Sequence, residues 1–395
     1  MLVILLGLGL ALVSTAPSVD IPRRPTAGDI ATARDLLRDI SAARTLGTPA
    51  RLDLDDGQIG AIGLLAGEAS GLQRIEAAID EDLVSARASV PLVGGLWINA
   101  SATVSGPHIG FPDIRFKVGR ISVPVVISRW SINLVRWFLV MRGADLPALD
   151  EIVQQFRVAD GWVNAELALP RGTGIIERVI GVAGASVNQQ LVTETYCRLA
   201  SARPQETSVQ LAALVREAFR GADRSDPVMY NRAAFVALAF HVVGEQAHSL
   251  APAAAIASNN CPAPVAPVLL QGRDDLAKHW AFSAALAAVL GEQRAANIGE
   301  WKELHDSLPS GSGFSFVDLA ADRSGLHVAR EALNPASAGA AARYLQTATE
   351  EDLLPEILVR GPEGLEEDQF VDSFGALDET RYREAVRLID RNLGR

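Results

Sequence analysis

Residues 156–170, FRVADGWVNAELALP, mark the point at which the chain changes from strand-like to helix-like patterns. Within this stretch, Asp160-Gly161 separates two runs that are rich in apolar residues alternating with polar ones. An Asp-Gly pair between two such runs indicates a tight β-hairpin, because both residues tolerate the positive φ angles that the turn requires. The stretch therefore predicts a hairpin that closes a β-rich region just before Pro170.

The residues upstream of this hairpin carry further strand signals. Apolar and polar residues alternate over 96–104 and over 114–118, as in strands with one buried face. Residues 50–54 alternate in the same way and lead into a second turn signal, Asp56-Gly57. Extended structure is therefore expected over most of 50–170.

Helices are expected in three places before Pro170. Apolar residues recur at helical spacing over 30–40, and less regular helical patterns cover 73–87 and 130–156. After Pro170 helical patterns dominate to the end of the chain, with a Pro/Ala-rich connection over 250–272.

These patterns predict an α+β protein, with a β-rich N-terminal domain followed by an all-helical C-terminal domain. A length of 395 residues agrees with two domains. The expected division is a membrane anchor or signal segment over 1–19, a linker and helix over 20–48, the β-rich domain over 49–170 and the helical domain over 171–395.

The first 19 residues, MLVILLGLGLALVSTAPSV, carry no charge. The run is close to the length that spans a bilayer, and its most apolar part resembles the core of a signal peptide. We expect export with this segment kept as a membrane anchor, which places the protein in the bacterial inner membrane, facing the periplasm. The alternative is a buried N-terminal helix of the core.

The net charge and the number of cysteines exclude some classes of partner and scaffold. A formal net charge of −11 without a basic stripe argues against nucleic acid. The two cysteines, Cys197 and Cys261, are too few for a disulfide-built scaffold, so either they form one bridge in an oxidising compartment or both are buried thiols.

Residues 274–325 place polar side chains at helical spacing on three successive segments. Ser315 precedes Asp318 by three residues, as in a capping box, and the loop before it is rich in glycine and serine. If the three polar faces meet, they form one cluster: His279, Ser283, Glu303, Asp306, Asp318 and Asp322.

Carboxylates grouped in this way cannot all ionise in a dry site, so a proton or a cation must neutralise part of the charge. One imidazole with several carboxylates suits a divalent metal ion. The sequence thus offers a metal site of His279, Asp306, Asp318 and Asp322, with Glu303 as general base and Ser283 as an orienting group at the catalytic centre. The alternatives are a structural polar network and ordinary surface charge.

Three blocks in this region resemble an uncharacterised family of bacterial envelope proteins and, more distantly, the YfiM-like and VanZ-like proteins. The resemblance implies an envelope setting and brings no settled chemistry. The matching positions are Lys278, His279 and Ser283; Lys302, Glu303 and Asp306; and Ser315, Asp318, Leu319, Asp322 and Gly325.

The β-rich region over 50–170 loosely resembles the lipid-groove domains of YpmS-like envelope proteins, which implies lipid binding. The leading hypothesis is therefore a membrane-anchored, exported, non-enzymatic envelope protein that binds a lipid or an envelope protein partner. The alternative is a metal-assisted hydrolase that acts on an envelope substrate. A second candidate ligand set, His241, Glu245 and His248, lies on one helical face.

Overall fold

The computed structural model divides the chain into two compact units, residues 1–174 and residues 175–395. The first unit is built mainly on antiparallel strands, and from about Gln189 onward nearly all the structure is helical, which confirms the α+β prediction. The structure describes residues 11–19, 24–70, 74–141, 147–168, 187–202, 207–221, 225–262, 266–307, 311–377 and 379–394.

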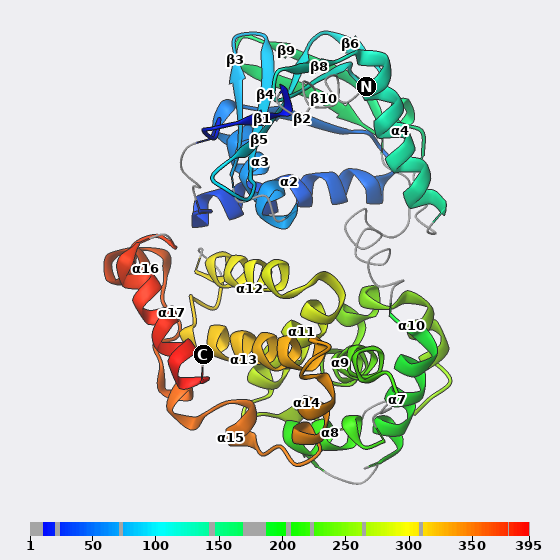
Figure 1. The fold of residues 1–395 in the computed structure, drawn as a ribbon, viewed down its shortest axis with the longest axis vertical. Helices are drawn as coiled ribbons and strands as arrows, with labels where there is room; N and C mark the ends of the chain where they lie inside the picture. The colour runs from blue at the N-terminus through cyan, green and yellow to red at the C-terminus, as the bar shows by residue number, and fades with distance from the viewer. Residues whose placement is uncertain are drawn as a thin grey trace. The chain divides into compact units, whose positions relative to one another are not determined.

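The first unit contains a six-stranded antiparallel sheet of order β3-β4-β5-β7-β8, with β1 pairing on β5 (Figure 1). Val13 and Ser14 of β1 lie opposite Ile98 and Trp97. The strands are β1 (Val13–Ser14), β3 (Ile75–Asp80), β4 (Leu83–Pro91), β5 (Trp97–Ser105), β7 (Ile114–Val118) and β8 (Ile121–Val123).

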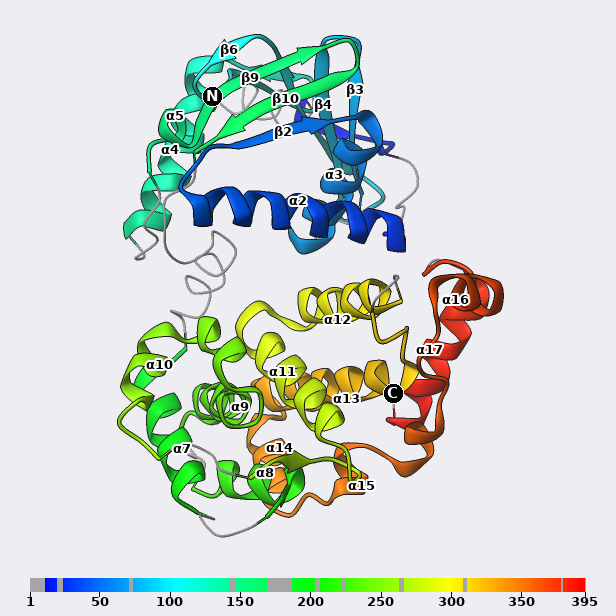
Figure 2. The same cartoon turned by 180° about the vertical axis from the view of Figure 1, so that it is seen from behind.

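A second, four-stranded sheet has the order β2-β10-β9-β6, and Figure 2 shows helix α2 running along it. Asp160 and Gly161 form the β9–β10 turn with φ angles of 53° and 75°, so the predicted hairpin is confirmed. The strands are β2 (Ala50–Leu54), β6 (His108–Ile109), β9 (Val153–Ala159) and β10 (Trp162–Leu167).

Buried side chains of β2, β9 and β10 form the core of this layer, and the apolar face of α2 packs against them. Helix α2 begins with a capping box between Thr26 and Asp29. The helices of the unit are α2 (Ala27–Leu46), α3 (Asp56–Ser70), α4 (Val125–Met141) and α5 (Leu149–Ile152).

Three local predictions in this unit were wrong. A helix was expected over 73–87, but residues 75–80 form β3 and residues 83–87 belong to β4, because pairing with neighbouring strands overrides their alanine-rich composition. Asp56-Gly57, read as a turn, begins α3, since Asp55 and Gln58 exchange side-chain and backbone hydrogen bonds in a capping box. The helix expected over 130–156 begins earlier, at Val125, and residues 153–156 belong to β9.

The structure describes residues 11–19 of the expected anchor, and residues 1–10 fall outside the described residues. After β1, the backbone N–H groups of Ser18 and Val19 donate to the Ser89 hydroxyl. Among the described helices, none combines the length and the apolar character that crossing a bilayer requires.

The second unit is organised around α9 and α11, two largely buried helices that pack on each other. A disulfide joins Cys197 of α7 to Cys261, so the two cysteines form one bridge. The helices are α7 (Gln189–Ala202), α8 (Leu211–Phe219), α9 (Pro227–Val243), η1 (Gly244–Leu250), α10 (Pro252–Ser258), α11 (Asp274–Leu290), α12 (Glu292–Asp306), α13 (Phe316–Leu333), α14 (Ala338–Leu345), α15 (Glu350–Leu353), η2 (Glu356–Arg360), α16 (Glu367–Phe374) and α17 (Thr380–Asn392).

The connection expected over 250–272 is more ordered than its composition indicated. Pro252 opens α10, where proline suits the first helical turn because it has no N–H to leave unpaired. Val268 and Leu269 form β12, which pairs in parallel with β11 (Val209–Gln210).

Candidate functional site

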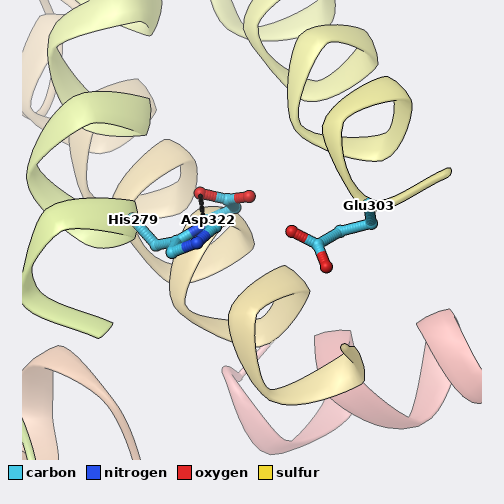
Figure 3. A group of neighbouring side chains, drawn as sticks. All are labelled: His279, Glu303 and Asp322. Atoms are coloured by element: carbon cyan, nitrogen blue, oxygen red, sulfur yellow. Dashed lines mark hydrogen bonds and ion pairs between the residues drawn. The ribbon is translucent and has the colours of Figure 1, made fainter. Parts of the chain in front are cut away.

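Helices α11, α12 and α13 pack against one another and bring their polar faces together. Helix α11 supplies His279 and Ser283, α12 supplies Glu303 and α13 supplies Asp322. Figure 3 shows the Glu303 carboxylate pointing toward the paired side chains of His279 and Asp322. The three polar stripes inferred from the sequence therefore meet in one place.

Asp322 is the centre of the cluster and is 3% exposed. Its Oδ1 accepts a hydrogen bond of 2.6 Å from the Ser283 hydroxyl and lies 3.1 Å from Nδ1 of His279. Its Oδ2 is buried and has no hydrogen-bond partner among the described residues. A buried carboxylate oxygen without a partner is costly, so this atom is placed to receive a ligand.

Contacts at the N-terminus of α13 determine where the carboxylates of Glu303 and Asp318 lie. The Ser315 hydroxyl caps the helix by accepting from the backbone N–H of Asp318. In a complete capping box Asp318 would accept in return from the N–H of Ser315, but Glu303 takes that N–H at 3.0 Å. The Asp318 carboxylate is therefore free to lie 3.7 Å from Nε2 of His279.

The cluster holds more negative than positive charge. Three carboxylates, those of Glu303, Asp318 and Asp322, face His279 and Lys302. Arg273 lies 3.9 Å from Asp318 but is shared with Asp275 and Glu363, and Lys302 is shared with Asp306. Lys302 lies 3.3 Å from Glu303 and 2.6 Å from Asp306. With all three carboxylates ionised, the site is short of at least one positive charge, which a proton or a cation must supply.

Burial and neighbouring charges shift the pKa values accordingly. Burial raises the pKa of Glu303 to about 8, and Lys302 only partly offsets it. Burial alone would lower the pKa of His279, but the charge and hydrogen bond of Asp322, together with the charge of Asp318, outweigh it and raise that pKa to about 9. Burial also raises the pKa of Asp318. The site therefore holds protons that a bound cation would displace.

A cavity of about 170 Å³ opens beside the cluster. Its walls combine His279, Ser283 and Asp322 with two lysines, Lys278 and Lys302, and with apolar side chains from α11 and α12. A second hollow of about 460 Å³ shares Val243 and Lys278 with it.

The predicted site residues fall into two groups. His279, Ser283, Glu303, Asp318 and Asp322 come together, whereas Asp306 lies at the edge of the cluster and pairs with Lys302. Within the described part of the chain, one set of three His, Cys, Asp or Glu side chains has its ligand atoms within 4.8 Å of one another: His279, Glu303 and Asp322.

The other candidate set, His241, Glu245 and His248, lines the larger hollow and is not such a set among the described residues. Burial lowers the pKa of His241 to about 4, so its imidazole is neutral. The His248 ring packs on Phe240 with centroids 5.0 Å apart.

Two residues that shape the site were not identified from the sequence. Gly299 of α12 lies against Asp322, and Arg273 lies 3.9 Å from Asp318 while it binds Asp275 at 2.6 Å. No local sequence signal marks Gly299, because its role depends on how closely two helices approach. Arg273 directly precedes α11 and the acidic pair Asp274-Asp275, which was the available signal.

Comparisons of the chain with protein-family models, with curated proteins and with solved structures find no match. The function is therefore argued from the geometry of the site.

Proposed function

We propose that the helical unit binds a divalent metal ion at His279, Glu303 and Asp322 and uses it for hydrolysis. The observation that carries the proposal is the convergence of these three ligand atoms within 4.8 Å beside a cavity. Three protein ligands with room for a water molecule or substrate are typical of catalytic metal sites.

The surrounding contacts support ligand roles for these side chains. Metal-binding histidines commonly give their second ring nitrogen to a carboxylate, and Asp318 lies on the Nε2 side of His279 while Asp322 lies on the Nδ1 side. Ser283 donates to Asp322 rather than to His279, so it orients a ligand and is not arranged as a nucleophile activated by histidine.

The geometry supports a different role for Glu303 from the one expected from the sequence. The sequence placed it as general base and put Asp306 in the ligand set. We now propose Glu303 as a ligand, because it lies within reach of both His279 and Asp322 whereas Asp306 pairs with Lys302. A bound ion would lower the pKa of a coordinated water and generate the nucleophile near neutral pH.

The cavity indicates the class of substrate. Two lysines, Lys278 and Lys302, and the apolar side chains of Phe282, Leu286 and Ile298 line it. Lysine is a common partner of phosphate groups. We propose a phosphate ester that carries an apolar substituent as the substrate.

The first test measures Mn²⁺ and Zn²⁺ binding to the purified full chain by titration calorimetry. Asp322→Asn and His279→Ala should each weaken binding by about tenfold or more. Glu331→Gln is the matched control on α13, because this exposed carboxylate pairs with Arg330 away from the cluster. Circular dichroism verifies that each variant is folded; folded ligand variants that bind either metal as tightly as wild type would refute the metal site.

The second test measures hydrolysis of p-nitrophenyl phosphate, bis(p-nitrophenyl) phosphate and p-nitrophenyl acetate with each metal. We expect hydrolysis of a phosphate ester that chelator removes and Asp322→Asn abolishes. If the protein binds metal but hydrolyses none of these esters, the site is a structural cation site and the proposed hydrolase activity is wrong. Such a result would favour the non-enzymatic lipid-binding or partner-binding alternative.

We also propose that the protein is exported, facing the periplasm from the bacterial inner membrane. The Cys197–Cys261 disulfide supports this, because such bridges persist in oxidising compartments and are rare in the cytosol. Thiol alkylation of the protein taken directly from cells tests it. Two reactive thiols after unfolding would contradict export.

A further inference from the structure

Helix α4 presents an apolar stripe to solvent in the first unit. Besides Ile127 and Val135, five large apolar side chains on it are between 44% and 80% exposed, and these five follow the spacing i, i+4, i+8, i+11 and i+15. This spacing places them on one face of the helix. They are Val126, Trp130, Leu134, Trp137 and Met141.

The opposite side of α4 is fixed to the unit. Helix α4 packs on β7, and Ser128 is buried. Arg129 binds Asp150 at 2.8 Å and lies 3.3 Å from Asp113. The exposed stripe is therefore held in a defined orientation.

Positive charge is concentrated in the segment that leads into this helix and includes it. The segment 114–141 has five basic residues and no acidic one, although the chain as a whole has a formal net charge of −11. Three of these, Arg115, Lys117 and Arg120, are exposed, and their side chains form no ion pair with any residue that the structure describes. The others are Arg136 and Arg129, and Arg129 is paired with Asp150 and Asp113.

We propose that α4 and the basic segment before it form a docking surface for an anionic phospholipid bilayer. An amphipathic helix that lies in the membrane interface combines an apolar face with nearby basic residues, and tryptophan is enriched at that depth. Anionic headgroups attract each basic residue near the surface. A second copy of the chain fits this surface less well than an anionic bilayer does, because it would place another basic segment against this one.

The surface is independent of the proposed metal centre, which is built from the other unit. Its basic segment touches the expected anchor, because the backbone N–H of Arg120 donates to the carbonyl oxygen of Ala11, so the test must report on α4 itself. Quenching of tryptophan fluorescence by bromine-labelled lipid meets this need, because only tryptophans that enter the bilayer are quenched.

The experiment adds the full chain to vesicles of brominated phosphatidylcholine with or without phosphatidylglycerol. We expect strong quenching with the anionic vesicles and little with phosphatidylcholine alone. The pair Trp130→Phe/Trp137→Phe should remove most of the quenching while the protein still binds. Trp162→Phe, which removes another exposed tryptophan, should leave the quenching in place.

A triple variant, Arg115→Glu/Lys117→Glu/Arg120→Glu, tests the charge. Its affinity for the anionic vesicles, followed by the same quenching, should fall by at least about tenfold. The proposal is overturned if the quenching survives Trp130→Phe/Trp137→Phe, or if vesicles without phosphatidylglycerol quench equally. A stable dimer that shields both tryptophans and that Leu134→Asp dissolves would overturn it in favour of self-association.

Discussion

Gly299 of α12 lies directly against Asp322 of α13: a Cβ atom added to Gly299 would stand 3.0 Å from Oδ2 of Asp322. That oxygen is buried and has no hydrogen-bond partner among the described residues. Glycine therefore leaves open the space next to the atom proposed to bind the metal ion. The residue also lines the cavity.

Gly299→Ala should weaken Mn²⁺ binding by about tenfold without unfolding the protein, because the new methyl group displaces the Asp322 carboxylate. Alanine favours helix over glycine, so the metal-free protein should be as stable as wild type or slightly more stable. Titration calorimetry and thermal unfolding measure the two effects.

The control for this substitution is Gly339→Ala on α14. The nearest atom to its added Cβ is a terminal nitrogen of Arg343 at 3.7 Å, an ordinary contact. Metal binding by this variant should equal that of wild type. Equal binding by Gly299→Ala as well would show that the space beside Oδ2 has no role in binding the ion.

Gly325→Ala should destabilise the helical unit. A Cβ at Gly325 would stand 2.3 Å from the carbonyl oxygen of Trp280, so α11 and α13 would have to move apart. Overpacking of this kind costs about 1–3 kcal/mol. Chemical denaturation should show a lower free energy of unfolding for Gly325→Ala and an unchanged or slightly higher one for Gly339→Ala, because alanine favours helix over glycine. A wild-type value for Gly325→Ala would contradict the close approach.

The metal-free protein should lose stability as the pH rises from 6 to 9. Glu303 holds its proton in the folded state up to about pH 8, against an ordinary pKa of 4.5, and His279 holds its proton up to about pH 9, against 6.5. Both pKa values are higher in the folded state than in the unfolded state, so the bound protons stabilise the folded state. This stabilisation is complete below the unfolded-state pKa values and is lost as the pH rises through the folded-state pKa values.

Thermal unfolding in the presence of chelator measures this effect, and we expect Tm to fall by roughly 5 °C or more across that range. Glu303→Gln should reduce the fall, because only the His279 contribution remains. Added Mn²⁺ should stabilise the protein more at pH 8 than at pH 6, since binding displaces protons. A Tm that rises with pH in chelator would contradict the buried, proton-holding cluster.

The parts of the fold that the sequence predicted correctly depend on short-range signals. Asp160-Gly161 defines its hairpin because the turn conformation is encoded in two adjacent residues. Ser315 caps α13 as its spacing from Asp318 indicated. The helix predicted over 73–87 was wrong because β3 and β4 form by pairing with each other and β4 pairs with β5, which no local pattern reveals.

The sequence predicted most of the residues that form the site, but not how they are arranged. Helical spacing placed His279 and Ser283 on one face, and both contact Asp322. The four-residue spacing of Lys302 and Asp306 indicated their ion pair, but spacing could not show that Glu303 turns inward, because that depends on how α12 lies on its neighbours.

The Cys197–Cys261 disulfide should contribute strongly to the stability of the helical unit, because it closes a loop between residues separated by 64 positions. For a loop of that size, the restricted unfolded state corresponds to about 4 kcal/mol. Dithiothreitol should lower Tm by roughly 8–16 °C, at about 2–4 °C per kcal/mol for a unit of this size. The variant Cys197→Ser/Cys261→Ser should unfold at the same lower temperature and show no response to the reductant. If wild type keeps its Tm after thiol titration has verified full reduction, the bridge does not stabilise the folded state.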